Sequence, residues 1–408
     1  MEQYKNKVFR LQGKLQQYAW GGHSFLPALL GIKEPGERPY AEYWMGAHDN
    51  ASSEIILPGT GTAVRLNEYI AAFPQDLLGK QVAEKFGRLP YLLKILDVRD
   101  MLSIQVHPSK KEAEKEFAGE NKRGIPLNAA DRNYKDDNHK PELMVALSEF
   151  WLLHGFKPED LLKATLQRIP ELSFLAPAFG SGGYQELYKT VMEMDQARVN
   201  ALLQPLLDRI LPAYKEGRLP KDSEDFWAAR AALTFNTDGR TDRGIFSVYL
   251  FNLVNLHPGE AIFQDAGLPH AYLEGQNVEI MANSDNVLRG GLTPKHVDVP
   301  ELMKHIVFAR TVPHTIYGKE VFPHIAAFRT PAPDFELSQI LLPEKSPVTI
   351  ASHSVEIFIV MEGKVKITEK NGDVFERKTG ECFIAFDRAE LSLQGVSDTV
   401  IYRAAVPE

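Results

Sequence analysis

The sequence predicts a mainly β protein with a helical insertion, and three observations lead to this fold class. Residues 1–107 mix aromatic and β-branched residues with Gly and Pro, the pattern of strands and turns. Residues 158–235 carry apolar residues at helical spacing, and a period of two returns from Gly244 onward. The sum is two β modules, barrels or sandwiches, around one helical block.

Local signals in the first part of the chain predict individual elements. Residues 89–107 contain two apolar runs, which we interpret as two buried strands joined by a short turn. The charged segment 109–120 predicts a helix with Ser109 as its N-cap. A polar loop follows, and the run 144–156 again resembles a strand.

The second part of the chain begins with the helical block. Pro158 suits the first turn of a helix, whereas Pro205 is expected to break or kink a later one. The turn at 257–259 separates two expected strands, and residues from about Phe322 onward alternate strands with Gly-marked turns. The simplest interpretation of the helical block is a packed subdomain without chemistry.

Composition and charge narrow the class of protein. The chain has 408 residues, 44% hydrophobic and 25% charged, and a net charge of −8, so it lacks the electrostatic footprint of a nucleic-acid-binding protein. The single cysteine excludes an intramolecular disulfide and fits a reducing cytosol. No signal peptide or apolar membrane-spanning run is visible, so we expect a cytoplasmic protein without a membrane partner. Sequence leaves the oligomeric state open, with a monomer as the working expectation.

Two short segments offer candidate metal ligands. In SIQVHP (103–108), Gln105 and His107 are two residues apart and would project from the same side of a strand. In HKPEL (139–143), Pro141 restricts the backbone, which favours fixed directions for Lys140 and Glu142. Taken alone, the first segment is more often structural and the second more often a charged loop.

Two later segments complete the pattern. Residues 258–275 place His270 after a Gly-marked turn, as in the second cupin motif, although Asp265 and Glu274 depart from that motif. In isolation His270 is also compatible with a core histidine. Residues 278–298 form a run dense in polar residues, either a surface loop or a substrate loop that carries Asp285, Arg289 and Lys295.

Together the segments supply two histidines, one carboxylate and one amide oxygen. Two His and one Glu are an ordinary catalytic zinc set with sites left for water or substrate. The neutral carbonyl of a glutamine is a harder ligand and less usual for zinc. The set does not by itself identify the metal.

The segments SIQVHP, HKPEL, QDAGLPHAYL and MANSDNVLRGGLTPK, in this order, are similar to the signatures of type I mannose-6-phosphate isomerases. YAWGG (18–22) and AEYWMGAH (41–48) also resemble N-terminal segments of that family, and the resemblance covers nearly the whole chain. Many members carry Leu-Trp-Met-Gly-Thr-His-Pro where this chain has EYWMGAHDN, but Trp44, Gly46 and His48 are kept.

The resemblance implies two cupin-like jelly-roll β-barrels and a helical domain. The implied catalytic barrel comprises 1–107, 136–157 and 244–320. The helical insertions comprise 108–135 and 158–243, and a degenerate barrel comprises 321–408. The implied reaction interconverts mannose 6-phosphate and fructose 6-phosphate, a small sugar phosphate being the partner.

The same resemblance implies functions for particular residues. It implies one Zn²⁺ per chain, and it places its ligands on Gln105, His107, Glu142 and His270. It also implies a set of residues that line the substrate pocket or sit at matching positions: Lys94, Ser103, Lys140, Tyr272, Glu279, Asp285, Arg289 and Lys295.

An aldose–ketose isomerisation moves a proton between C1 and C2 through a cis-enediolate. Arg289 stays protonated, so it cannot be the base, but it can stabilise the enediolate. Lys94, Lys295 and Ser103 are expected to hold the phosphate, and Tyr272 to line the pocket. Lys140 is left open between the phosphate and the reacting centre.

The general base is left open among Glu279, Asp285, His48 and a zinc-bound hydroxide. Two other classes of function are considered. A cupin metal oxidoreductase is disfavoured by the Gln ligand and the basic set. A non-catalytic sugar-phosphate-binding regulator is disfavoured by the intact ligand set and Arg289.

Overall fold

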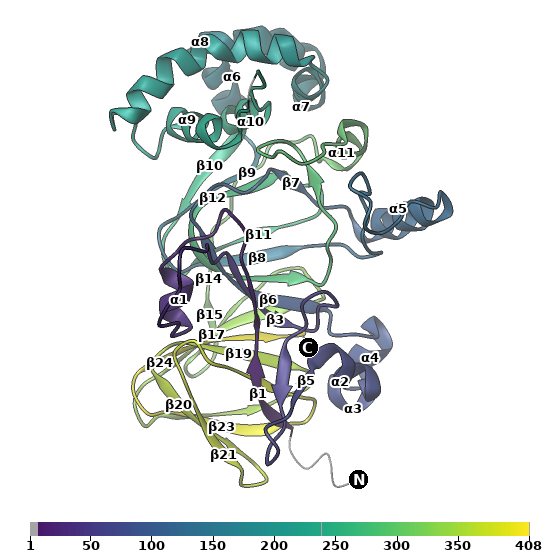
Figure 1. The fold of residues 1–408 in the computed structure, drawn as a ribbon, viewed down its shortest axis with the longest axis vertical. Coiled ribbons are helices and arrows are strands. Elements are labelled where there is room, and N and C mark those ends of the chain that lie inside the picture. Colours follow the sequence, from purple (N-terminus) through teal and green to yellow (C-terminus); the bar gives the residue numbers. More distant parts are fainter. Residues whose placement is uncertain (1–6, 238, 408) are drawn as a thin grey trace.

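The computed structural model describes residues 7–237 and 239–407, and the layers of the fold follow one another along the long axis of the molecule (Figure 1). The helices of residues 159–250 gather at one end. A large sheet occupies the middle, and strands from the last part of the chain form the opposite end. Within the described residues the strands form three sheets, of 11, 9 and 4 strands.

The central sheet has 11 strands and follows the order β14-β11-β8-β12-β6-β3-β2, with β7, β9, β10 and β13 attached beside this path. Its strands are β2 (Lys14–Gln16), β3 (Glu42–Gly46), β6 (Tyr91–Val98), β7 (Gln105–Val106), β8 (Glu142–Ala146), β9 (Phe150–Phe156), β10 (Phe251–Leu256), β11 (Glu260–Gln264), β12 (His270–Ala282), β13 (Leu288–Arg289) and β14 (Ile316–Tyr317).

Strand β12 holds the central sheet together because it pairs with four other strands. Its first half pairs with β7 and β9, and its second half pairs with β6 from Gly275 onward and, on its other side, with β8 from Asn277 onward. Gly275 has φ 131°, and a Cβ there would lie 2.6 Å from the carbonyl oxygen of Glu149. Only glycine fits this close approach without displacing the backbone.

The second sheet has nine strands and combines both ends of the chain. Three N-terminal strands join it, with β1 paired to β22 and to β4. Its strands are β1 (Val8–Gln12), β4 (Glu54–Ile56), β5 (Ala63–Arg65), β15 (Lys319–Phe322), β16 (Ile325–Phe328), β17 (Glu336–Leu342), β19 (Glu356–Glu362), β22 (Cys382–Ala385) and β24 (Thr399–Ala405). A third sheet contains β18 (Pro347–Ala351), β20 (Lys364–Glu369), β21 (Val374–Lys378) and β23 (Glu390–Gly395).

The expected mainly β architecture with helices is confirmed, but its two closed barrels are not. The strand orders are open paths, and no pairing between the described residues joins the first strand of a path to its last. Local alternation predicts strands and their buried faces, whereas closure depends on tilt and register across many strands. The division into three domains stays a prediction.

The helices are α1 (Phe25–Leu29), α2 (Leu66–Ala72), α3 (Pro74–Leu78), α4 (Lys80–Phe86), α5 (Lys110–Lys122), α6 (Glu159–Arg168), α7 (Ala176–Met192), α8 (Gln196–Lys215), α9 (Glu224–Phe235), α10 (Gly244–Leu250), α11 (Val299–His305) and the 3₁₀ helix η2 (Pro170–Leu175). The N-cap prediction is confirmed, since the Ser109 hydroxyl accepts from the N–H of Glu112 in α5.

Two local predictions are wrong, and a third is wrong in part. Residues 1–107 contain the short helices α1 to α4 as well as strands, and residues 244–250 form α10 rather than a strand. All of α10 is buried, and periodicity cannot separate a buried helix from a buried strand. Of the break or kink expected at Pro205, the break is not found: helix α8 continues through Pro205, because Val199, Leu203 and Leu206 pack its buried face into the core.

Two faces of the central sheet have different surroundings. Leu93, Ile95 and Val278 pack with Ile357 and Ile384 of the second sheet in one hydrophobic cluster. Side chains alternate along a strand, so the intervening positions of β6 and β12 point to the other face. That other face therefore carries the polar residues described below.

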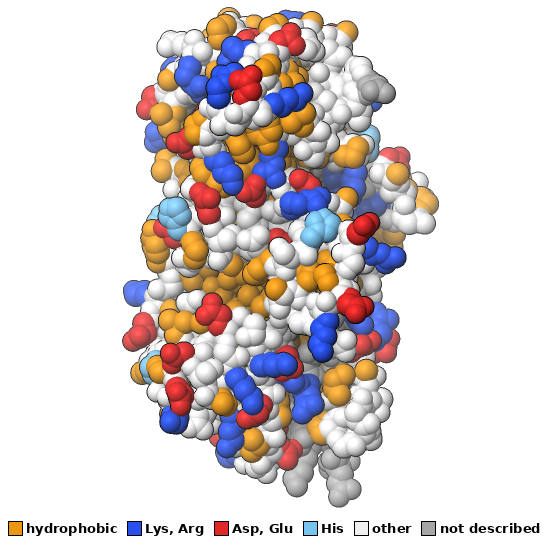
Figure 2. Space-filling view, turned by 60° about the vertical axis from the view of Figure 1, so that its left-hand side comes forward, with side chains coloured by type: hydrophobic (Ala, Val, Ile, Leu, Met, Phe, Trp, Pro, Cys, Tyr) orange, Lys and Arg blue, Asp and Glu red, His pale blue; other side chains and the backbone are white. Residues whose placement is uncertain are grey.

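The helices pack directly on the strands that surround the candidate site. One hydrophobic cluster contains Val106 and Leu153 of the central sheet and Ile104 just before β7, together with Leu187 and Leu203 from the helices. Within the described residues, none of the helices is long and apolar enough to span a bilayer. Figure 2 shows Lys and Arg side chains interspersed with Asp and Glu over one face of the molecule.

Tyr91 connects the two large sheets, and its removal should destabilise the fold. Its buried hydroxyl lies 2.9 Å from the carbonyl oxygen of Val355 and 3.1 Å from that of Ala404. Tyr91→Phe leaves both acceptors without this donor, so we expect the free energy of unfolding in urea to fall by about 1–3 kcal/mol. Tyr317→Phe, at an exposed tyrosine that donates to Glu260, should change it by less than about 0.5 kcal/mol. Equal effects would contradict the prediction.

Candidate metal centre and surrounding residues

Three segments bring His107, Glu142 and His270 together. His107 directly follows β7, Glu142 begins β8 and His270 begins β12. All three side chains are buried, and their ligand atoms lie within 4.8 Å of one another. The sequence placed these residues in one ligand set, and the strands now show how segments far apart in the chain meet.

The tautomer of each histidine is set by a backbone carbonyl. His107 Nδ1 lies 2.8 Å from the oxygen of Asn286, and His270 Nδ1 lies 2.9 Å from the oxygen of Leu268. A carbonyl only accepts, so each Nδ1 carries the proton and each Nε2 presents a lone pair. Burial lowers the pKa of His107 to about 4, which keeps its ring neutral at neutral pH.

The free ring nitrogens face the Glu142 carboxylate. His107 Nε2 lies 3.4 Å from Oε1 and His270 Nε2 lies 3.2 Å from Oε2, yet neither nitrogen has a hydrogen-bond partner among the described residues. Three acceptors that face one another in a buried site repel unless a cation lies between them. The residues therefore fit a divalent ion with the donors of a catalytic zinc site.

Glu142 is kept ionised by a neighbouring lysine. Burial by itself raises the pKa of a carboxyl group, but Lys140, whose Nζ lies 3.0 Å from Oε1, and the contacts with His107 and His270 together outweigh burial. The pKa of Glu142 is held well below its ordinary value, so the carboxylate is available as a ligand. Lys140 thus contacts a candidate metal ligand. This contact favours the reacting centre over the phosphate as the group that Lys140 serves.

Gln105 shares a face with two predicted site residues. It is the register partner of His270 in β12 and of Arg289 in β13. Residues directly opposite one another in antiparallel strands project to the same side. This register supports, without testing, the prediction that Gln105 is a fourth ligand.

A buried polar network lies on the same face of the central sheet. Lys94 Nζ is 3.4 Å from Glu42 Oε2 and 3.3 Å from Glu279 Oε2, and it lies 4.9 Å from the centre of the Trp44 ring. Tyr272 donates its hydroxyl to Glu279 Oε1 at 2.8 Å. Burial and the charge of Glu142 raise the pKa of Glu279, although Lys94 opposes them. Burial would lower the pKa of Lys94, but its two carboxylate neighbours raise it.

Asp285 forms a separate pair with His48. Its Oδ1 lies 3.2 Å from His48 Nε2, and its side chain is 38% exposed. Burial raises the pKa of Asp285, but the contact with His48 and the charges of Lys140 and Lys94 together lower it, so the net shift is downward. The two base candidates, Glu279 and Asp285, therefore have opposite pKa shifts.

Sequence analysis missed the residues that hold the Asp285 loop. Asp136 accepts from the backbone N–H of Asp285 at 2.7 Å and from the hydroxyl of Ser284 at 2.8 Å. Asn286 donates to the carbonyl oxygens of Asp136 and Asn138, while its own carbonyl accepts from His107. The density of Asn and Asp in both segments was the available signal, but it did not reveal their pairing.

Arg289 and Lys295 provide positive charge without a counterion. Neither side chain has a hydrogen bond or ion pair with any residue that the structure describes, and burial lowers the pKa of both. The charge of Arg289 further lowers the pKa of Lys295. Ser103 lies nearby in the chain path, between Leu102, which donates to Tyr272 O, and Ile104, which donates to Gly291 O.

The fold and site define a metal-dependent enzyme class: a mainly β scaffold with a buried His–Glu–His set beside unpaired basic groups. The profile of phosphomannose isomerase type I, catalytic domain, matches residues 8–159. Mannose-6-phosphate isomerase of Escherichia coli K12 is 37% identical over 395 residues, covering 95% of this chain and 97% of that relative. The chain belongs to the type I mannose-6-phosphate isomerase family.

More distant relatives and solved structures agree with this membership. Mannose-6-phosphate isomerase of Bos taurus is 33% identical, covering 98% of this chain and 96% of the relative. A zinc-bound crystal structure of mannose 6-phosphate isomerase has a TM-score of 0.86 at 33% identity, covering 99% of this chain and 100% of that one. A mutant phosphomannose isomerase from Salmonella typhimurium gives a TM-score of 0.87 at 33% identity, covering 98% and 100%.

Removing the carboxylate should empty the metal centre. Glu142→Gln replaces a charged ligand by a neutral amide, so metal affinity should fall by at least about 10²-fold, since even outer-shell changes cost 10–100-fold. The measurement is metal content after dialysis at a fixed free zinc concentration. Glu68→Gln, at an exposed glutamate on α2, should keep the metal content of the unmodified protein. Full metal content in Glu142→Gln would show that the ion binds elsewhere.

Proposed function

We propose that this chain interconverts mannose 6-phosphate and fructose 6-phosphate, with one zinc ion held by His107, Glu142, His270 and Gln105. The observation that carries the proposal is the convergence of two histidine lone pairs on a buried carboxylate. The names of the relatives and the zinc-bound neighbour support the same reaction and metal. A monomer in the cytoplasm, acting without nucleic acid or membrane, is part of the proposal.

The bound zinc would act as a Lewis acid on the oxygen atoms at C1 and C2 of the sugar. We assign the removal of the carbon-bound proton to Glu279. Its raised pKa makes it a better base near neutral pH than Asp285, whose pKa is lowered. Tyr272 and Lys94 hold the two oxygens of Glu279, so its orientation is fixed before the substrate arrives.

Arg289 is the group that stabilises the enediolate. Its guanidinium has no partner among the described residues and shares a face with Gln105, so it is free to meet charge that develops at the metal centre. Lys140 supports the same centre through Glu142. These assignments put two cations, Arg289 and Lys140, near the negative charge of the transition state.

The phosphate is assigned to Lys295 and Ser103. Lys295 is exposed and has no counterion within the described part of the chain, which suits the binding of a dianionic group. Lys94 was predicted to read the phosphate as well. Because two carboxylates already surround it, we now assign Lys94 to the orientation of Glu279.

A coupled assay tests the reaction. The protein should convert mannose 6-phosphate to fructose 6-phosphate, lose activity in a chelator and regain it with zinc. Free mannose leaves the phosphate-binding groups without a partner, so its kcat/KM should be lower by about 10⁴-fold. Equal kcat/KM for the two sugars, or full turnover by metal-free protein, would overturn the proposal.

Arg289→Ala should lower kcat by about 10²-fold or more, the scale of losing one donor to an oxyanion, while zinc content and thermal melting stay unchanged. Arg289→Lys should recover only part of the loss, since an ammonium lacks the guanidinium fork. Arg218→Ala, at an exposed arginine paired with Glu216, is the matched control and should keep full activity. If only KM rises, Arg289 binds substrate and transition state equally.

A further inference from the structure

The loop that follows Arg289 has a backbone conformation that needs external support. Gly291 has φ 126° and Leu292 has φ 53°. A left-handed backbone is unfavourable for a residue with a Cβ, so Leu292 must be held in place by its surroundings. On one side, Gly290 N–H donates to Ile104 O at 2.9 Å and Ile104 N–H donates to Gly291 O at 3.0 Å.

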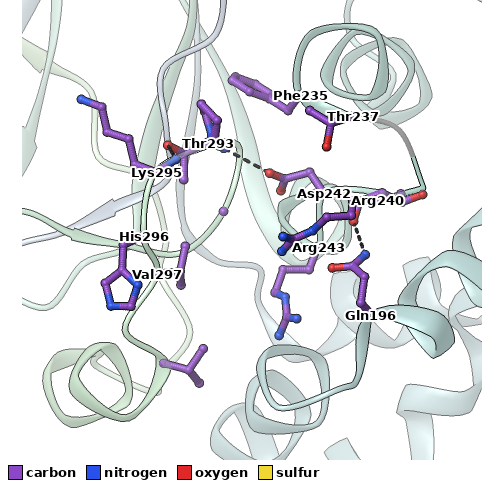
Figure 3. A pocket seen from close by; sticks show the side chains of 14 residues that line it. Gln196, Phe235, Thr237, Arg240, Asp242, Arg243, Thr293, Lys295, His296 and Val297 are labelled. Carbon is purple, nitrogen blue, oxygen red and sulfur yellow. Dashed lines mark hydrogen bonds between the residues drawn. The ribbon is translucent and has the colours of Figure 1, made fainter. Parts of the chain in front are cut away.

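The other side of the loop is held by Asp242, which comes from the segment between α9 and α10. Its Oδ1 accepts from the backbone N–H of Leu292 at 2.8 Å and of Gly244 at 2.7 Å, and its Oδ2 accepts from Thr293 at 3.1 Å. Figure 3 shows the carboxylate directed at Thr293. Hydrogen bonds to a charged acceptor are roughly twice as strong as neutral ones.

The two backbones are also too close for any side chain between them. A Cβ on Gly244 would lie 2.6 Å from the nitrogen of Leu292, and one on Gly291 would lie 2.6 Å from the Cα of Gly244. Asp242 itself is fixed, because its N–H donates to Asn236 Oδ1 at 2.9 Å. The contact of Asp242 and Gly244 with residues 291–293, here called the clamp, is therefore a rigid connection between the helical end of the molecule and the loop.

This contact lies three residues after Arg289 in the chain. The Arg289 guanidinium has no hydrogen bond or ion pair within residues 7–237 and 239–407. The position of the backbone is therefore what sets the starting point and direction of the side chain. That backbone is held on one side by β7 and, three residues later, by Asp242.

We propose that Asp242 is a positioning residue, whose carboxylate fixes the backbone of 290–293 and thereby directs Arg289 at the metal centre. The proposal rests on the proposed function, in which Arg289 stabilises the enediolate. It adds a residue of the helical end to the machinery of the reaction. Asp242 does not touch the substrate and acts through the loop.

The test combines Asp242→Asn with Arg289→Ala. Asparagine keeps the size of aspartate but turns one acceptor into a donor, which then faces a backbone N–H. In the unmodified background, Asp242→Asn should lower kcat by about 10-fold to 10²-fold with a smaller change in KM. In the Arg289→Ala background the same change should matter by less than about 2-fold, because the residue it positions is gone.

Asp398→Asn is the matched control, since Asp398 also accepts a backbone N–H, that of Glu344 at 3.0 Å, but lies between the C-terminal strands β23 and β24. It should keep full activity. Asn236→Ala, which loosens Asp242 without removing it, is a milder second variant and should show a smaller loss with the same dependence on Arg289. The loss is then measurable even if Asp242→Asn does not fold.

Amide hydrogen exchange gives a readout that does not need catalysis. The N–H groups of Leu292 and Thr293 should exchange slowly in the unmodified protein and faster in the Asp242 or Asn236 variant. An equal loss of kcat with and without Arg289, or unchanged kcat, would overturn the positioning role. If the unmodified protein fails to turn over mannose 6-phosphate, the proposed function fails, and unchanged exchange would separately overturn the clamp.

Discussion

The main constraint on the candidate site is that the fold must hold together three buried acceptors that repel one another. The Nε2 atoms of His107 and His270 and the carboxylate of Glu142 face one another with no proton to share, because both imidazole protons are used by backbone carbonyls. A fold can hold such a group only if the strands that carry it are rigid and a cation completes it. The three segments are accordingly fixed by the central sheet, and Lys140 supplies a positive charge beside the carboxylate.

Strand β12 carries one of the three acceptors and also links the metal centre to the rest of the polar face of the central sheet. It begins at His270, a metal-ligand candidate, and changes partner strands at Gly275. Its second half carries Glu279. The change of partners allows Tyr272 and Glu279, both on this strand, to form a hydrogen bond at 2.8 Å. A single strand thereby connects the metal centre with the carboxylate whose environment suits a base.

The positively charged side chains around the site fall into two groups, those paired with a carboxylate and those without a partner. Lys94 and Lys140 are buried against carboxylates, whereas Arg289 and Lys295 have no partner in the described part of the chain. Paired cations orient protein groups, and unpaired ones remain available to an anionic substrate. The two loops that carry the unpaired or exposed groups are fixed by Asp136 and Asp242, both through backbone N–H groups.

Sequence by itself determined the metal-ligand candidates, the family and most of the strand and helix types. Gln105 and His107 follow a strand period, Ser109 is a local cap, and the segment 284–295 is specific to the family. These features depend on residues close together in the chain, so a linear pattern contains them.

Tertiary structure alone showed that Lys94 is enclosed by Glu42 and Glu279, that β1 joins the C-terminal sheet and that Asp242 meets the Arg289 loop. It also decided that 244–250 is a helix and that α8 continues through Pro205. Register, burial and packing decide such features, and they join residues up to hundreds of positions apart.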